Sequence, residues 1–122
     1  MEINSKGTVT VKVTKDNCAS SMGSGTLDVF ATPSMIALME NAACKAIEKF
    51  LKEGESTVGT GIDVKHTKAT PLGDEVTATA TLTAVEGRKL TFEVTASDSV
   101  GEIGKGLHER FIINIEKFLS KL

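Results

Sequence analysis

Three polar side chains of the 122-residue sequence stand where they could do chemistry: Thr32, Glu40 and His66. Glu40 falls inside the apolar arc of a predicted helix, between Ile47 and Leu51 when residues are projected at about 100° each. A carboxylate among aliphatic side chains loses hydration, so it must find donors or take up a proton. Two interpretations stay open: an edge residue that reaches water or pairs with a histidine, and a catalytic carboxylate in a dry pocket.

The spacing of these residues limits how they can meet. Thr32 and Glu40 are two helical turns apart, about 12 Å along one axis, so a single helix cannot bring them into contact. A dimer in which each subunit supplies part of the site could do so. His66 alone is more often structural than catalytic. His108 and Arg110 form a second pair late in the chain, where Arg110 is either a surface ion-pairing residue or a clamp for an anion or carboxylate.

The helix that must carry Thr32 and Glu40 is predicted over residues 32–51. Thr32 suits the N-cap, Pro33 suits the first helical position, and Gly54 ends the helix. Its apolar arc is wide and comprises Met35, Ile36, Met39, Ala43, Ala46, Ile47, Phe50 and Leu51. Such a wide arc requires a sheet to cover it.

The rest of the chain alternates with a period of two residues, which is typical of half-buried strands. Strands are predicted over residues 8–14, 56–70, 76–85, 90–97 and 103–115, with a short helical tail over 116–122. On the second strand, Val58, Ile62, Val64 and His66 share one face. The Ser- and Gly-rich segment 16–28 is either a flexible linker or a lid over a site.

These elements predict one α+β domain over residues 1–122, in which a five-stranded antiparallel sheet wraps one long central helix. Such a sheet leaves its edge strands open, which favours a homodimer.

Composition and motifs exclude several classes of function. The 14 basic and 16 acidic residues form no basic stripe, which argues against a nucleic-acid partner. No apolar run approaches the ~20 residues of a membrane span, and the N-terminal residues lack a signal-peptide profile, so a cytoplasmic protein is expected. Cys18 and Cys44 indicate reduced thiols, and two histidines without ligand spacing predict no metal. Phosphate loops, dinucleotide fingerprints and G-x-S-x-G elbows do not occur.

The segment 30–43, FATPSMIALMENAA, is similar to the helix of the fluoroacetyl-CoA thioesterase family of hotdog-fold enzymes. The resemblance extends from Val9 to Ile115. It implies the hotdog fold and acyl-thioester hydrolysis, with catalytic residues at Thr32, Glu40 and His66. Glu40 would be the nucleophile or general base, Thr32 would position it, and His66 would assist proton transfer.

The same resemblance implies substrate-binding positions at Gly59 and Arg110, with His108 beside them. The segment 16–28 contains no aromatic residue, unlike the apolar lid associated with fluoroacetyl selectivity, which favours a general short-chain acyl-CoA as substrate. Coenzyme A would then enter as part of the substrate, and no separate cofactor is expected. Two alternatives are a non-catalytic acyl-CoA-binding module and a hotdog hydratase. The Asp-x-x-x-x-His pattern of the hydratases is replaced here by Asp63 and Lys68.

Overall fold

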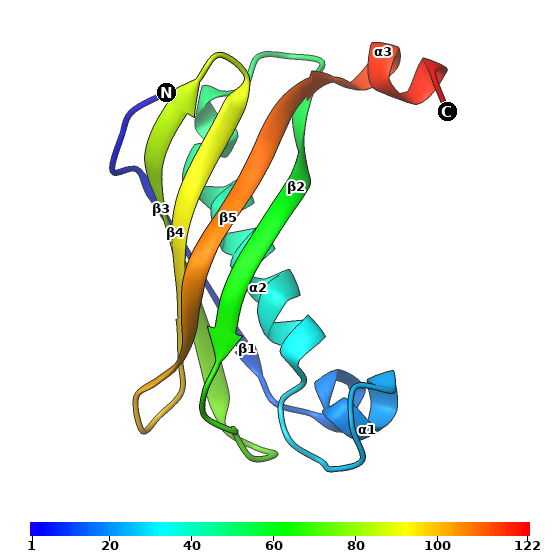
Figure 1. Cartoon of the computed structure of the whole chain (residues 1–122), viewed down its shortest axis with the longest axis vertical. Coiled ribbons are helices and arrows are strands. Elements are labelled where there is room, and N and C mark those ends of the chain that lie inside the picture. Colours follow the sequence, from blue (N-terminus) through cyan, green and yellow to red (C-terminus); the bar gives the residue numbers. More distant parts are fainter.

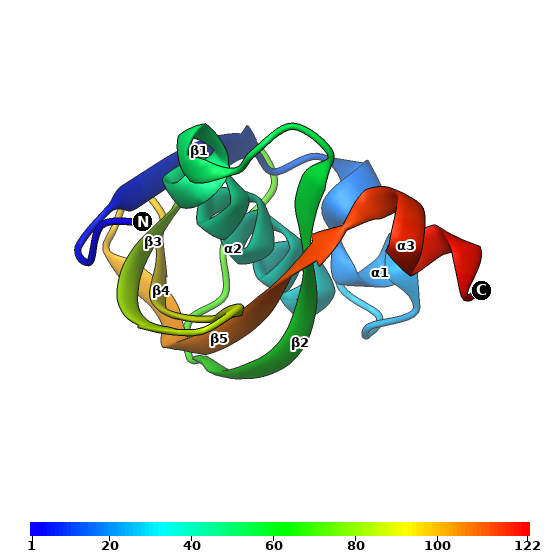
Figure 2. The same cartoon turned by 90° about the horizontal axis from the view of Figure 1, so that it is seen from above.

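Helix α2 (Thr32–Ile47) runs through the centre of the molecule, and one antiparallel sheet curls around it (Figures 1 and 2). The computed structural model describes residues 1–122. Its strands are β1 (Lys6–Lys12), β2 (Glu55–His66), β3 (Glu75–Glu86), β4 (Lys89–Ser97) and β5 (Glu102–Asn114), in the spatial order β1-β3-β4-β5-β2. The predicted α+β architecture is therefore confirmed, and β1 and β2 are the edge strands.

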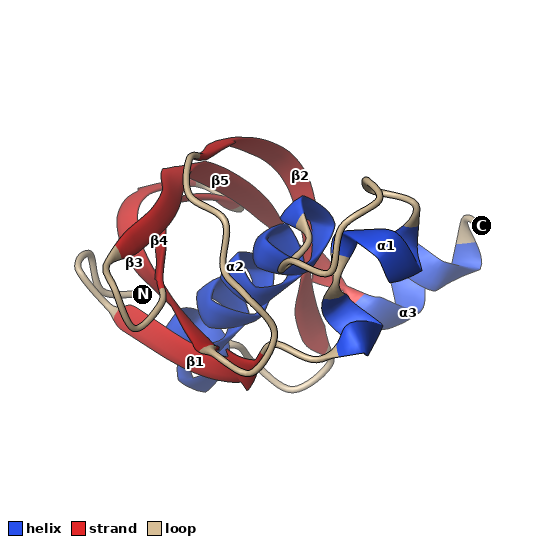
Figure 3. Cartoon of the chain, turned by 90° about the horizontal axis from the view of Figure 1, so that it is seen from below, coloured by secondary structure: helices blue, strands red, loops and turns tan.

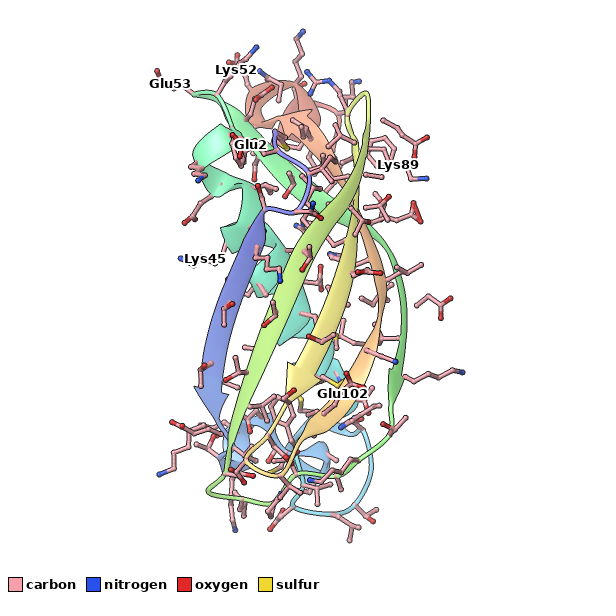
Figure 4. All side chains as sticks on the ribbon, turned by 90° about the vertical axis from the view of Figure 1, so that its left-hand side faces the viewer. Glu2, Lys45, Lys52, Glu53, Lys89 and Glu102 are labelled. Atoms are coloured by element: carbon pink, nitrogen blue, oxygen red, sulfur yellow. The ribbon has the colours of Figure 1, made fainter.

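The core lies between α2 and the concave face of the sheet. The helix contributes Met35, Leu38, Met39, Ala42, Ala43, Ala46 and Ile47, and the central strands contribute Val76, Ala78, Ala80, Leu82, Leu90, Phe92, Val94 and Ala96. The alternation of β3 and β4 buries one face of each strand, except that Ala84, which follows the register shift after Leu82, is only half-buried. Strand β1 approaches the helix so closely that a Cβ atom on Gly7 would clash with the Ala42 carbonyl. Charged side chains such as those of Lys45 and Lys89 project away from this core (Figure 4).

Both ends of the predicted central helix differ from expectation. Ala31 occupies the N-cap, and Thr32 is the first helical residue, so Thr32 does not cap its own helix. The α-helix ends at Ile47 and continues as the 3-10 turn η2 (Glu48–Phe50) before Gly54, whose φ is 83°.

The segment predicted as a loop contains the turn η1 (Lys15–Asn17) and the short helix α1 (Ala19–Met22). Figure 3 shows α1 beside the N-terminal end of α2. The predicted helical tail forms α3 (Ile115–Ser120). None of the helices is long and apolar enough to cross a membrane.

A β-bulge in β2 changes which residues face the helix. Gly59 pairs with Arg110 but Gly61 pairs with Glu109, so the register shifts at Thr60. The prediction that Val58 shares a face with His66 was wrong, because the extra residue reverses the alternation. Before the bulge it is Gly59 that lies against the helix, and beyond it His66 does so. The bulge therefore places Gly59 and His66 on the same, helix-facing side of β2.

Candidate active site

Thr32 and His66 form the first of two polar clusters. The Thr32 Oγ1 and His66 Nδ1 atoms are 2.7 Å apart, and they join the first residue of α2 to the last residue of β2. His66 Nε2 is buried and has no hydrogen-bond partner in the chain. Burial lowers the pKa of His66, and the Lys68 backbone only partly opposes this, so the ring is neutral at neutral pH. A neutral imidazole is able to accept a proton.

This cluster lies at the end of the sheet nearest α1. The pair borders a hollow of about 260 Å³ that is also lined by Ser24, Phe30 and Lys68. The segment between α1 and α2 lines this hollow with polar Ser24 and with apolar Val29 and Phe30.

Glu40 and Arg110 form the centre of the second cluster. Arg110 Nη1 donates to Glu40 Oε2 at 3.0 Å, an ion pair in which the arginine side chain is 8% exposed and the carboxylate side chain 41%. Arg110 Nε donates to Thr57 Oγ1 at 2.9 Å, and Nη2 donates to the Thr57 carbonyl at 3.1 Å. The guanidinium is therefore held by one strand and directed at the helix.

Of the two interpretations of Glu40 that the sequence leaves open, this geometry favours the edge residue that reaches water. Its partner is Arg110 rather than Thr32 or His66, and its side chain is partly exposed in the single chain rather than enclosed in a dry pocket. Neither does Thr32 contact Glu40, since its hydroxyl bonds to His66 instead.

His108 is buried behind Arg110 and supports it. Its Nδ1 lies 2.7 Å from the Gly61 carbonyl, and its Nε2 lies 3.2 Å from Arg110 Nη1. Because an arginine can only donate, Nε2 must accept and the Nδ1 hydrogen must point to Gly61. Burial, which the Gly61 carbonyl partly opposes and the nearby Arg110 charge reinforces, lowers the pKa of His108. His108 is thus held neutral, and in this form its Nε2 atom accepts from Arg110 and positions the guanidinium.

Gly59 leaves the space in front of the carboxylate open. A Cβ atom at this position would lie 2.7 Å from Glu40 Oε2 and 3.2 Å from Arg110 Nη1, so any side chain would displace the ion pair. Gly59, Glu40 and His108 line a hollow of about 410 Å³ together with Gly61 and Ile62 of the β2 edge. The carboxylate therefore faces a space that is bordered by an unpaired strand edge.

The structure brings together the predicted site residues in two groups rather than one. Thr32 joins His66, whereas Glu40 joins Gly59, His108 and Arg110, and the two hollows share no lining residue. Sequence reasoning missed Thr57, whose hydroxyl and carbonyl anchor Arg110. The sequence carries no local signal for this role, because Thr57 and Arg110 are 53 residues apart.

Replacing Arg110 with lysine should lower kcat for acyl-thioester hydrolysis, the activity that the resemblance implies, by ~10- to 100-fold. Hydrogen bonds to charged groups contribute about 1.5–3 kcal/mol, and a lysine ammonium cannot reproduce the planar set of donors of a guanidinium. Steady-state kinetics and a thermal melt test this expectation. The matched control is Arg88→Lys, since exposed Arg88 donates to the Ile112 carbonyl away from the site. Unchanged KM and kcat in Arg110→Lys would reduce Arg110 to a structural cation.

Solved structures share the fold over almost the whole length of this chain. The fluoroacetyl-CoA thioesterase FlK superposes with a TM-score of 0.94 at 41% identity, over 99% of this chain and 94% of that chain. A FlK mutant in complex with fluoroacetate and CoA superposes with a TM-score of 0.90 at 41% identity, over 97% and 99% of the two chains. A long helix wrapped by this sheet is the hotdog fold, and the protein is a hotdog-fold thioester hydrolase.

Sequence comparison identifies the family. The family model of FlK, the fluoroacetyl-CoA-specific thioesterase, matches residues 13–116. The fluoroacetyl-CoA thioesterase of Streptantibioticus cattleyicolor is 52% identical over 95 residues, which are 78% of this chain and 68% of that protein. The chain belongs to the FlK family of fluoroacetyl-CoA-specific thioesterases, which confirms the resemblance seen in residues 30–43.

Proposed function

We propose that this protein hydrolyses short-chain acyl-CoA thioesters, with Glu40 acting on the thioester carbonyl as nucleophile or general base. The observation that carries the proposal is a partly exposed carboxylate held 3.0 Å from a buried guanidinium, beside a glycine that leaves room for a substrate. The relatives named for fluoroacetyl-CoA, and the FlK complex with CoA, support the choice of thioester.

The reaction breaks the C–S bond, transfers the hydroxyl of water to the acyl carbon, and releases CoA as the thiol. Glu40 either attacks the carbonyl or takes the proton from water. One proton of the water must reach the departing thiolate in either case. The neutral His66 ring accepts this proton, from Glu40 where Glu40 is the base and from the water that opens the anhydride where Glu40 attacks, and passes it to sulfur; Thr32 orients the ring through its hydroxyl. General acid–base assistance of this kind contributes ~10²–10⁴-fold to rates.

Gly59, Arg110 and His108 form the substrate-binding side of the site in this proposal. Gly59 admits the acyl group next to Glu40, and Arg110, backed by His108, keeps the carboxylate aligned with it. No metal or separate cofactor enters the mechanism. The free thiols Cys18 and Cys44 are in keeping with a reducing compartment, and we infer a cytoplasmic enzyme.

The working unit in this proposal is a homodimer joined through the β2 edges. Strand β2 is unpaired on one side, and its residues Gly61 and Ile62 border the Glu40 hollow. An edge strand of this kind is a template for pairing with a second copy. Pairing there would enclose the carboxylate and set it beside residues of the partner subunit.

Turnover of a panel of acyl-CoAs, measured as free thiol release, tests the function. We expect acetyl-CoA, propionyl-CoA and fluoroacetyl-CoA all to be hydrolysed, with kcat/KM values that differ by no more than about 200-fold, since one small group in an apolar pocket discriminates by about 10- to 200-fold. Tight binding of CoA esters without turnover would instead identify a binding module. A strong preference for fluoroacetyl-CoA would contradict the proposed broad acyl specificity but not the proposed thioester hydrolysis.

A further inference from the structure

Asp98, which lies in the connection from β4 to β5, has a fully buried carboxylate that accepts four hydrogen bonds. Oδ2 accepts from Lys68 Nζ at 2.6 Å and from Thr70 Oγ1 at 2.8 Å. Oδ1 accepts from the backbone amides of Val100 at 2.9 Å and Gly101 at 3.1 Å. Oδ1 thus accepts hydrogen bonds from the turn that contains Asp98, and Oδ2 accepts hydrogen bonds from the segment 67–70.

The segment 67–70 directly follows His66. The Thr67 and Lys68 amides both donate to the Ile103 carbonyl, at 2.8 and 3.3 Å, and these bonds hold the start of the segment. The side chains of Lys68 and Thr70 reach Asp98, so its carboxylate holds the middle and the end.

The same segment also holds the start of α2. The Phe30 amide donates to the Thr70 carbonyl at 2.9 Å, and Phe30 stands two residues before Thr32. Asp98 is therefore joined to His66 through Lys68 and to Thr32 through Thr70. Both routes end at the 2.7 Å contact between Thr32 Oγ1 and His66 Nδ1.

The charge of Asp98 strengthens this connection. Its side chain is 0% exposed, whereas that of its partner Lys68 is 35% exposed. Burial acts to raise the pKa of Asp98, but the bonds from Lys68, the Val100 and Gly101 amides and Thr70 outweigh it and hold the pKa well below its usual range. A buried carboxylate with four donors resists displacement, because moving it would leave charge and donors unpaired.

The turn between β4 and β5 does not depend on Asp98 alone. Asp74, the residue before β3, accepts from Ser99 Oγ at 2.8 Å and from the Ser99 amide at 3.4 Å. Asp74 therefore ties the same turn to the sheet without touching residues 67–70. The distinctive contribution of Asp98 is its contact with the segment that leads to the site.

We propose that Asp98 is a positioning residue for thioester hydrolysis: through Lys68 and Thr70 it holds the Thr32 hydroxyl and the His66 imidazole in register. The inference rests on the proposed function, in which His66 moves the proton. A small misplacement of a catalytic group can cost up to ~10²-fold in rate, so loss of this connection should be visible in kcat.

The test is Asp98→Asn, which keeps the shape of the side chain and removes its charge. We expect kcat on acetyl-CoA to fall ~10- to 100-fold with KM changed less than about threefold, because alignment rather than substrate contact is lost. The control is Asp74→Asn, which removes the carboxylate that contacts the same turn from the residue before β3 and should leave kcat unchanged even where it lowers the melting temperature.

A milder pair of variants covers the case in which Asp98→Asn does not fold. Thr70→Val removes only the hydroxyl donor, and Thr70→Ser retains it. We expect kcat to fall in Thr70→Val and to be restored in Thr70→Ser. A folded Asp98→Asn or Thr70→Val that melts earlier but keeps the wild-type kcat would overturn the proposal, because Asp98 would then be structural only.

A spectroscopic readout separates this inference from the proposed function. The chain has two histidines, so its imidazole nitrogens give two sets of NMR signals. The set from His66 should move in Asp98→Asn and Thr70→Val and stay in place in Asp74→Asn. Even if the wild type hydrolyses no thioester, an unmoved His66 signal would refute the positioning role, and a moved one would support it.

Discussion

Replacing Glu40 with glutamine should lower kcat at least ~100-fold while binding of CoA esters survives. Glutamine keeps the shape of the side chain, and its amide oxygen can still accept from Arg110, but it can neither attack a carbonyl nor take a proton from water. Because Glu40 is the carboxylate partner of a buried guanidinium, we also expect a small loss of stability, about 1 kcal/mol. Thiol-release kinetics, calorimetric titration with a CoA ester and a thermal melt measure the three effects.

Glu48→Gln is the matched control for this experiment. Glu48 follows the same helix, is well exposed and pairs loosely with Lys45 at 4.0 Å, so its loss should change none of the three measurements. Wild-type turnover in Glu40→Gln would make Glu40 a structural anion that merely neutralises Arg110. Loss of both turnover and ligand binding would indicate that the ion pair shapes the pocket rather than performing the chemistry.

The parts of the fold that sequence could predict are those set by local pattern. Strict alternation in residues such as Val76, Ala78 and Leu82 predicts a buried face, and each of these side chains is fully buried. The apolar arc of residues 32–51 predicts a central helix for the same reason. In both cases neighbouring residues along one element decide the outcome.

Other features depend on residues that are distant in the sequence, and these could not be predicted. The bulge at Thr60 exists only relative to β5, and it reverses the faces of β2 that simple alternation assigns. Thr32 could cap its own helix or bond to a histidine 34 residues away, and the structure has the second arrangement. Likewise, the carboxylate of Glu40 finds its donor 70 residues later, in Arg110.

The candidate site shows the same division. Resemblance to a family predicted Thr32, Glu40 and His66 as catalytic residues, with Thr32 positioning Glu40; the structure joins Thr32 to His66 instead, and the catalytic roles stay a prediction. The supporting residues Thr57 and Asp98 carry no motif, because an ordinary threonine and an aspartate in a turn acquire their roles only through packing. Both residues are connected to the site only through hydrogen bonds to residues far away in the sequence.

Mixing Thr32→Ala with Glu40→Gln should restore activity that neither variant shows alone. Within one chain, Thr32 pairs with His66 and Glu40 pairs with Arg110 in a separate hollow, so we propose that a second subunit completes the set of catalytic groups. If the set is shared across the dimer, a mixed dimer contains one site with both substitutions and one site with neither. Random reassociation of equal amounts should then recover about one quarter of wild-type activity.

The alternative arrangement gives the opposite result. If each site were contained in one chain, every subunit of a mixed dimer would carry one substitution, and the mixture would stay as inactive as its components. Light scattering at micromolar concentration must accompany the assay, because an active monomer would show that the site does not need a second subunit. Activity should be recovered only in mixed dimers. A covalently linked tandem of the two variants should therefore show about half of the activity of a linked wild-type pair, because one of its two sites is intact. That result would place Glu40 and the Thr32–His66 pair of one functional site on different subunits.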